Sequence, residues 1–215
     1  MMNLLNKMFG QLATSRAFQI VFMLFIGIFI LVLRNPDPIL NSVVYTEDGQ
    51  WVGRALSNGW LNTFINAKDG YFVWGNLALL WASVTTSEAI CNDPLVCLPQ
   101  GIAFYSYFTF SSLALLVFIS TRNIISTTLR TILFILVLII PMGDSANEII
   151  GRLSNVGYVA VLAATLLFYY KGFLDSKLLH VSIDIFLVLL AGTNPVVIPV
   201  TGLFVFYNML ITSEK

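Results

Sequence analysis

The stretch that decides the fold is AFQIVFMLFIGIFILVL, residues 17–33, which contains no charged side chain. Lys7 and Arg16 precede it and Arg34 follows it. A helix of about 20 apolar residues crosses the hydrocarbon core of a bilayer, so this run with its flanks is long enough to span. The next residues, 35–38, read NPDP and do not form the small-residue site at which a signal peptide is cleaved. The stretch therefore predicts a membrane helix that remains as an uncleaved anchor.

The rest of the chain shares this apolar character. Of its 215 residues, 58% are hydrophobic and 10% are charged, and the mean hydropathy is +0.86. A soluble domain carries about a quarter charged residues, so an ordinary soluble enzyme and a disordered chain are excluded. A net charge of zero also argues against a nucleic-acid partner. Further apolar runs occupy residues 102–120, 129–142, 156–170, 179–191 and 196–211. We predict one all-α domain, 1–215, a polytopic transmembrane helical bundle of about six spans.

The tryptophans set one region apart. All four lie between positions 51 and 81, at Trp51, Trp60, Trp74 and Trp81. Tryptophan concentrates at the membrane–water boundary because its ring is apolar while its N–H needs a partner. The segments 47–65 and 71–84 are therefore predicted to be helices that lie on the membrane surface or dip into it, and not spans. They lie in a large outer loop, 34–101, and a second outer loop follows at 143–155.

Positive charges test this topology. With the N-terminus inside and six spans, the inner side holds Lys7, Arg16, Arg122, Arg130, Lys171, Lys177 and Lys215, and the outer side holds Arg34, Arg54, Lys68 and Arg152. This excess fits the positive-inside rule. A seven-span topology in which 71–90 crosses and the N-terminus is outside fits the charges slightly better, so charge alone does not separate the two topologies. Lys7, Arg16 and the tryptophan cluster favour six spans.

Cys91 and Cys97 lie six positions apart in a proline-flanked loop. They are either two unpaired thiols or a small disulfide loop, and the second requires an oxidising compartment. A zinc site is not expected, because His180 is distant in sequence and the three residues do not supply four ligands.

Polar side chains mark two places where chemistry could occur. Glu47 and Asp48 open an amphipathic segment whose polar face carries Arg54. Acids in a first helical turn also simply favour the helix dipole. In the second outer loop, Glu148 and Arg152 stand four residues apart and are followed by Asn155; this cluster is either a solvated loop or a second wall of a polar site. Asp184, within the run 179–191, is interpreted as interfacial rather than functional, since Lys177 is near.

Several catalytic motifs are missing from the sequence. It has no glycine-rich phosphate loop, nucleophile elbow or His–Glu metal motif. What remains is chemistry by carboxylates, an arginine and amides at the outer surface of the membrane.

One family pattern fits these features. The segment Glu47-Asp48-Gly49 … Gly59-Trp60 … Asp69-Gly70-Tyr71-Phe72 resembles the first outer loop of bacterial GT-C-type membrane glycosyltransferases, in particular the serotype-converting glucosyltransferases that use a polyprenyl-phosphate sugar. The order of later features is also similar, with a Glu148 … Asn155 loop and a Gly192 … Asn194-Pro195 break. Members of the family are commonly much longer, so the resemblance covers their N-terminal half.

The resemblance implies both a reaction and a set of residues. The bundle would transfer a sugar from a polyprenyl-phosphate donor to a cell-surface glycan such as O-antigen, on the outer face of the bacterial inner membrane. The implied catalytic acids are Asp48, Glu47 and Glu148. The candidate substrate-binding residues are Arg54, Arg152, Asn155 and Tyr71. A carboxylate can take the proton of the acceptor hydroxyl, and an arginine or a divalent cation can hold the leaving phosphate.

Two other functions are alternatives. The chain could be a non-catalytic accessory or assembly protein of a membrane, or a transporter or flippase. Transporters often contain internal repeats, and this sequence contains none.

Overall fold

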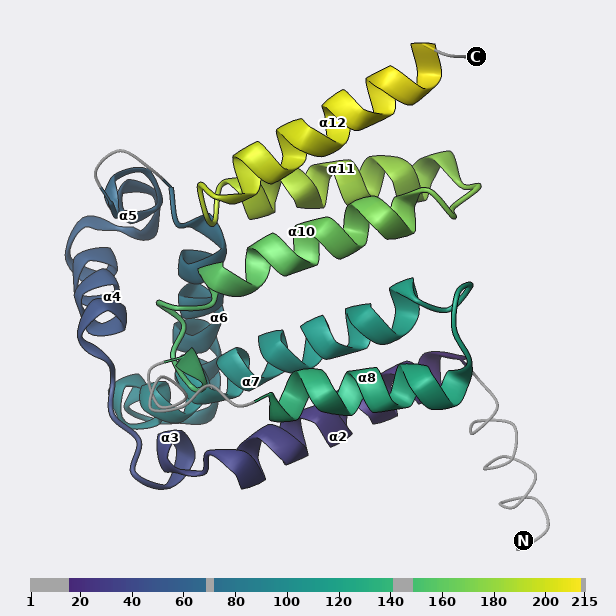
Figure 1. Cartoon of the computed structure of the whole chain (residues 1–215). Helices are drawn as coiled ribbons and strands as arrows, with labels where there is room; N and C mark the ends of the chain where they lie inside the picture. Colours follow the sequence, from purple (N-terminus) through teal and green to yellow (C-terminus); the bar gives the residue numbers. More distant parts are fainter. Residues whose placement is uncertain (1–15, 69–71, 141–148, 214–215) are drawn as a thin grey trace, which may run out of the picture.

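The computed structural model describes residues 16–68, 72–140 and 149–213, and these residues form helices, turns and loops without a strand. Six helices run side by side along one direction, as Figure 1 shows. They are α2 (Arg16–Arg34), α7 (Pro94–Ser120), α8 (Thr127–Ile139), α10 (Gly157–Lys171), α11 (Lys177–Ala191) and α12 (Val197–Ser213). The all-α class predicted from the sequence is therefore confirmed for the described residues.

Four helices occupy one end of this bundle. They are α3 (Asp37–Leu40), α4 (Thr46–Asn58), α5 (Trp60–Asn66) and α6 (Trp74–Ile90), and we call residues 37–68 and 72–90 the end layer. Figure 1 shows α4 and α6 running across the direction of the bundle helices rather than along it. The α7 helix joins the two parts, since it packs against α6 as well as against α2, α8 and α10.

Two of the described helices are long and apolar enough to cross a membrane, by length and composition. They are α2 over Ala17–Arg34, with a mean hydropathy of 2.5, and α7 over Pro94–Ser120, whose most apolar stretch of 18 residues has a mean hydropathy of 1.9. The apolar helices α8 and Val159–Lys171 of α10 are shorter. The observed helices thus contain two candidate spans, and a bundle of six spans stays a prediction.

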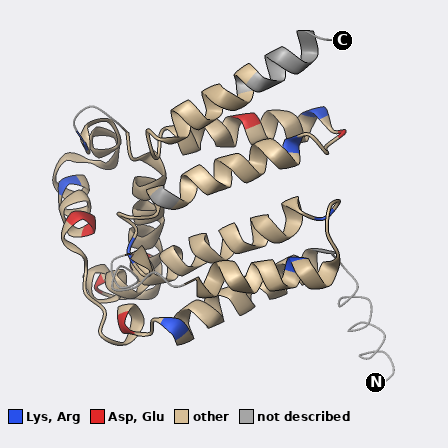
Figure 2. Ribbon diagram, in the orientation of Figure 1, with Lys and Arg blue, Asp and Glu red and all other residues tan. Residues whose placement is uncertain are grey.

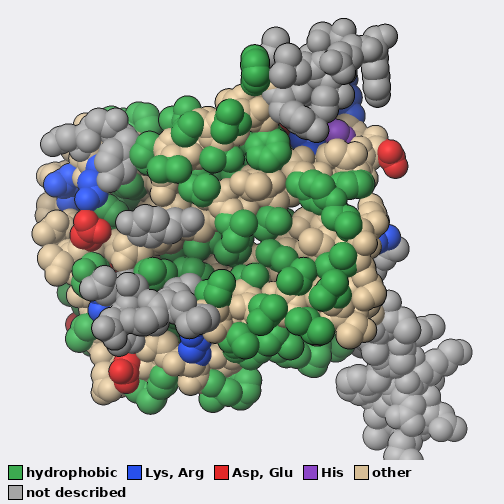
Figure 3. Space-filling model, viewed as in Figure 1, with side chains coloured by type: hydrophobic (Ala, Val, Ile, Leu, Met, Phe, Trp, Pro, Cys, Tyr) green, Lys and Arg blue, Asp and Glu red, His purple; other side chains and the backbone are tan. Residues whose placement is uncertain are grey.

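The outer face of the bundle is apolar. On α2, five side chains at helical spacing are exposed: Phe18, Phe22, Phe25, Phe29 and Leu33. Hydrophobic side chains cover much of the face in Figure 3, and most charged residues in Figure 2 lie toward the two ends of the long helices. Asp184 lies within α11 and forms an ion pair with Lys171, the last residue of α10.

The α6 helix differs from its prediction. It extends to Ile90, beyond the predicted end at 84, and six of its residues are buried within the protein: Asn76, Leu77, Leu80, Ser83, Val84 and Ser87. The reason is tertiary, since α4, α7 and α11 all pack against α6. Trp81 remains half exposed, as expected of a boundary residue.

Cys91 and Cys97 form a disulfide, with their Cα atoms 6.4 Å apart. The bridge joins the end of α6 to the first turns of α7, so it lies where the end layer meets the bundle. This resolves the alternative that the sequence left open.

Segment 149–156 is fixed to the same end of the bundle by long-range hydrogen bonds. Asn35 donates its side-chain amide to the Ile150 carbonyl at 3.2 Å, and the Gly151 N–H donates to the Ser106 hydroxyl at 2.9 Å. Gly151 has a φ of +93°, and a Cβ there would collide with Pro38. These contacts place segment 149–156 beside the end layer, although Asn35 and Ile150 are 115 residues apart in the chain.

Candidate functional site

A cavity of about 380 Å³ lies between the end layer and the bundle. Its walls come from α4, the residues after α5, the start of α6, segment 153–157 and the turn between α11 and α12. The residues that line it are Glu47, Trp51, Lys68, Val73, Asn76, Ser154, Asn155, Gly157, Thr193, Asn194, Pro195 and Val196. Polar groups and an aromatic ring thus line one partly open cavity, and a few polar groups that converge on a pocket are typical of a ligand site.

A carboxylate and an amine meet at this cavity. The Lys68 Nζ lies 3.0 Å from Glu47 Oε1 and 5.8 Å from the centre of the Trp51 ring. Glu47 is in the first turn of α4, where a negative charge is favoured by the helix dipole. About a third of the Lys68 side chain and two fifths of the Glu47 side chain are exposed, so both groups can reach a ligand. Lys68 was not among the residues predicted from the sequence, which offers only an isolated lysine near Asp69.

Asp48 occupies a different position from its neighbour. Its side chain is fully buried, and Oδ2 accepts a hydrogen bond from the Leu153 N–H at 3.2 Å. Burial raises the pKa of Asp48 from 3.8 to about 6; the amides of Leu153 and Ser154 oppose the shift, Glu47 adds to it, and Arg152 reduces it. Its other oxygen, Oδ1, meets hydrogen-bond geometry with no described residue. Asp48 therefore joins α4 to segment 149–156 instead of lining the cavity.

Asn76 makes the corresponding link from α6. Its Nδ2 donates to the carbonyls of Leu153 at 2.6 Å and of Ser154 at 2.8 Å, and the residue is 1% exposed. The sequence reasoning missed Asn76 as a site residue. The available signal was an amide inside the apolar first half of the helix, because a buried amide requires specific partners.

The α11–α12 turn completes the wall through close backbone contacts. The Trp74 N–H donates to the Gly192 carbonyl at 2.9 Å, and the Gly75 N–H donates to the Thr193 hydroxyl at 3.0 Å. A Cβ at Gly192 would collide with the Trp74 ring, so only glycine permits this approach. Asn194 donates to the Gly157 carbonyl at 3.0 Å and thereby ties the turn to α10.

The other predicted residues divide into three groups. Asn155 lines the cavity. Arg54 and Arg152 do not line it: Arg54 donates to the Asn66 carbonyl at 2.8 Å, and the Arg152 guanidinium lies 4.0 Å from the centre of the Tyr45 ring. Glu148 and Tyr71 lie outside the described residues.

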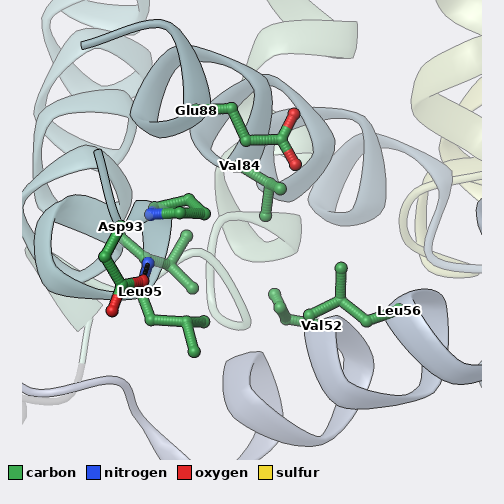
Figure 4. A pocket seen from close by; sticks show the side chains of 8 residues that line it. Val52, Leu56, Val84, Glu88, Asp93 and Leu95 are labelled. Atoms are coloured by element: carbon green, nitrogen blue, oxygen red, sulfur yellow. Dashed lines mark hydrogen bonds between the residues drawn. The ribbon is translucent and has the colours of Figure 1, made fainter. Parts of the chain in front are cut away.

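A second cavity, of about 210 Å³, has another character. Figure 4 shows Val52 and Leu56 of α4 facing Val84 of α6 and Leu95 of α7. Glu88 and Asp93 also line it, and the Asp93 carboxylate accepts from the Leu95 N–H at 3.0 Å as the N-cap of α7. Its apolar walls offer few hydrogen bonds, so the polar cavity is the better candidate site.

Among residues 16–68, 72–140 and 149–213, no three His, Cys, Asp or Glu side chains are grouped to hold a metal ion. The chain matches no known protein family, no curated protein and no solved structure.

Proposed function

We propose that α2, α7, α8, α10, α11 and α12 span a bilayer as one multi-pass domain, with the end layer at the membrane surface. The exposed apolar faces support this arrangement, because apolar side chains facing outward over several helices need lipid around them. The placement of most charges toward the bundle ends supports it as well (Figure 2). The shorter helices would then need flanking residues to complete their spans.

The end layer would face the outside of a bacterial inner membrane. Disulfides persist in oxidising compartments, and the Cys91–Cys97 bridge is located where the layer meets the bundle. For six spans, the positive-inside rule gives the same orientation, since fewer lysines and arginines lie on this side. Two independent physical arguments thus agree on the direction.

Within this arrangement, we propose a GT-C-like glycosyltransferase that moves a sugar from a polyprenyl-phosphate donor to a cell-surface glycan. The observation that carries the proposal is the polar cavity, in which Glu47, Lys68 and Trp51 meet at the boundary end of an apolar bundle. A donor with a lipid tail and a sugar head needs this combination of apolar surroundings and a polar enclosure. Sugar rings commonly pack against an aromatic side chain such as Trp51 while amides bind their hydroxyls.

In this proposal the base is Glu47 rather than Asp48, because Glu47 lines the cavity and Asp48 is buried. The acceptor oxygen forms a bond with the anomeric carbon of the donor, and the bond from that carbon to the phosphate oxygen breaks. The acceptor proton passes to the Glu47 carboxylate, and the electron pair leaves with the phosphate, whose charge Lys68 can neutralise. Asp48 is then a positioning residue, because its hydrogen bond to Leu153 holds the wall that carries Asn155. Arg152 lies beside Tyr45, near this wall, and in this proposal its positive charge acts on the site only over a longer distance.

The test is transfer of a labelled sugar in membranes that contain the full chain. Each of a set of polyprenyl-phosphate hexoses is supplied with lipopolysaccharide as acceptor. We expect Glu47→Gln to reduce transfer by about 100-fold or more, as is usual for loss of a general base. Glu88→Gln, an exposed acid of the apolar cavity, is the matched control and should transfer at the normal rate. If Glu47→Gln transfers sugar at the normal rate, Glu47 is not the base. If the unmodified chain transfers no sugar, the non-catalytic accessory role is favoured.

A further inference from the structure

An ion pair lies on the outer surface of α10 and α11, away from the candidate site. The Lys171 Nζ is 2.5 Å from Asp184 Oδ1, and 54% of the Asp184 side chain is exposed. Asp184 is the only Asp, Glu, Lys or Arg among residues 178–191, and it stands seven residues into α11, about 10 Å along the helix. In the proposed membrane arrangement this exposed carboxylate faces lipid.

Such a position is unusual for a charged side chain. Acids and bases within a spanning helix nearly always face the interior of the bundle or a cavity that holds water. A lysine near the end of such a helix usually extends toward the water, whereas Lys171, the last residue of α10, pairs with an acid about two turns inside α11. The two charges neutralise each other, but the half-exposed carboxylate still needs a polar surface to cover it.

The residues around Asp184 show what shape that surface has. Val181, Asp184 and Val188 are spaced by three and four positions, so they lie on one side of α11, and we call them the α11 strip. Val181 is 47% exposed and Val188 is 63% exposed, whereas Leu187 packs into the core between α10, α11 and α12. The strip is therefore a narrow apolar surface with one charge at its centre and the opposite charge beside it.

The arrangement of these charges identifies the partner. A negative and a positive group lie side by side, and a two-fold rotation brings the Asp184 of one copy against the Lys171 of another. The same rotation packs the valines of the two strips together. A lipid chain has no charge to offer, and a partner of a single charge sign would place like charges in contact. A second copy of this chain satisfies both requirements.

We propose that the chain forms a two-fold symmetric homodimer in the membrane through the α11 strip. Lys171 and Asp184 of the two copies then alternate in one closed network of four charges. This inference rests on the spanning arrangement given under the proposed function and goes beyond the transfer reaction. No residue of the strip lines the polar cavity, so each copy has its own candidate site.

The first experiment exchanges the charges between two copies that carry different affinity tags. The full chains are expressed together and extracted in mild detergent, and the amount of one copy that purifies with the other is measured. Lys171→Asp gives each copy two acids, and Asp184→Lys gives each copy two bases. Each variant paired with itself should lose about tenfold or more of the co-purified copy, because the network then holds four like charges.

The two variants expressed together should associate as well as the unmodified chain does. Acids of one copy then face bases of the other, and this recovery cannot come from the folding of either copy alone. The dimer would be refuted by unmodified copies that do not purify together, by variants that associate with themselves normally, or by a mixture that does not recover.

Cysteine cross-linking tests the strip without changing its charges. The only two cysteines of the chain form the Cys91–Cys97 disulfide, so an introduced cysteine is the single free thiol. Val188→Cys should form covalent dimers when membranes are oxidised with copper phenanthroline. Phe186→Cys is the matched control: Phe186 is 49% exposed on the same helix but points about 200° away from Val188, so it should not cross-link.

Failure of the dimer and failure of the proposed function give different results. Equal cross-linking by Val188→Cys and Phe186→Cys, or none by Val188→Cys, rejects the strip as an interface. Copies that stay separate but still transfer a labelled sugar reject the dimer and leave the transferase in place. Copies that associate through the strip but transfer no sugar support the dimer and reject the transferase.

Discussion

The buried carboxyl of Asp48 makes the stability of this protein depend on pH in a defined direction. Its pKa is raised from 3.8 to about 6, so the folded protein holds the proton more tightly than the unfolded chain does. The stabilisation is therefore fully present below pH 3.8 and is lost as the pH rises through 6. A pKa raised from 3.8 to about 6 corresponds to about 3 kcal/mol in the free energy of unfolding, and the Asp48 side chain is fully buried, so solvent screens it little.

Asp48→Asn tests this reasoning. The amide keeps an oxygen that can accept from the Leu153 N–H, and it carries no charge at any pH. We expect the variant and the unmodified protein to unfold at similar temperatures near pH 4. At pH 7 the variant should be more stable by up to about 3 kcal/mol, because only the unmodified protein must ionise a buried group.

The assay is tryptophan fluorescence during thermal unfolding in detergent, from pH 4 to pH 7. Glu88→Gln is the control, since Glu88 is exposed in the same layer, and it should follow the unmodified protein. Other carboxylates titrate over the same range, so the difference between Asp48→Asn and the unmodified protein is the measured quantity. Parallel pH curves for these two proteins would refute the packing of α4 on segment 149–156.

Two further predictions concern packing and topology. Gly192→Ala should destabilise the protein by about 1–3 kcal/mol, because its Cβ meets the Trp74 ring. Gly53→Ala is the control: no atom lies within 4 Å of a Cβ at this position, so the substitution should stabilise α4 by about 0.5–1 kcal/mol. Both variants are compared in a thermal melt, and equal unfolding temperatures would show that the contact between residue 192 and Trp74 is absent. Ser57→Cys, exposed on α4, should react with a membrane-impermeant maleimide added to the outside of intact cells, and labelling only after the cells are opened would reverse the proposed orientation.

Several features of the fold follow directly from the sequence. Apolar runs predicted the helices of the bundle, because a helix that faces lipid or a core must carry apolar side chains, and these are visible in the sequence without knowledge of the fold. The tryptophan cluster identified the region that became the end layer. Glu47 and Asp48 were correctly expected in the first turn of a helix, which begins at Thr46.

The burial of α6 and the roles of the two acids depended on packing. Glu47 and Asp48 are adjacent in sequence, yet one lines the cavity and the other is buried against Leu153, because successive helix residues point about 100° apart. The helical pattern gives this separation, but it does not tell which side faces the cavity.

The sequence by itself determined which kinds of segment this protein contains: apolar helices, a boundary region rich in tryptophan, and acids at the start of α4. Only the tertiary structure decided the site, because Lys68, Asn76, Ser154 and Thr193 approach one another across more than 100 residues of chain. Helical periodicity is a local property, because it depends only on residues that are close together in the sequence. A cavity wall depends on contacts such as those of Gly192 with Trp74 and of Asn76 with Leu153, which form only when distant segments pack together.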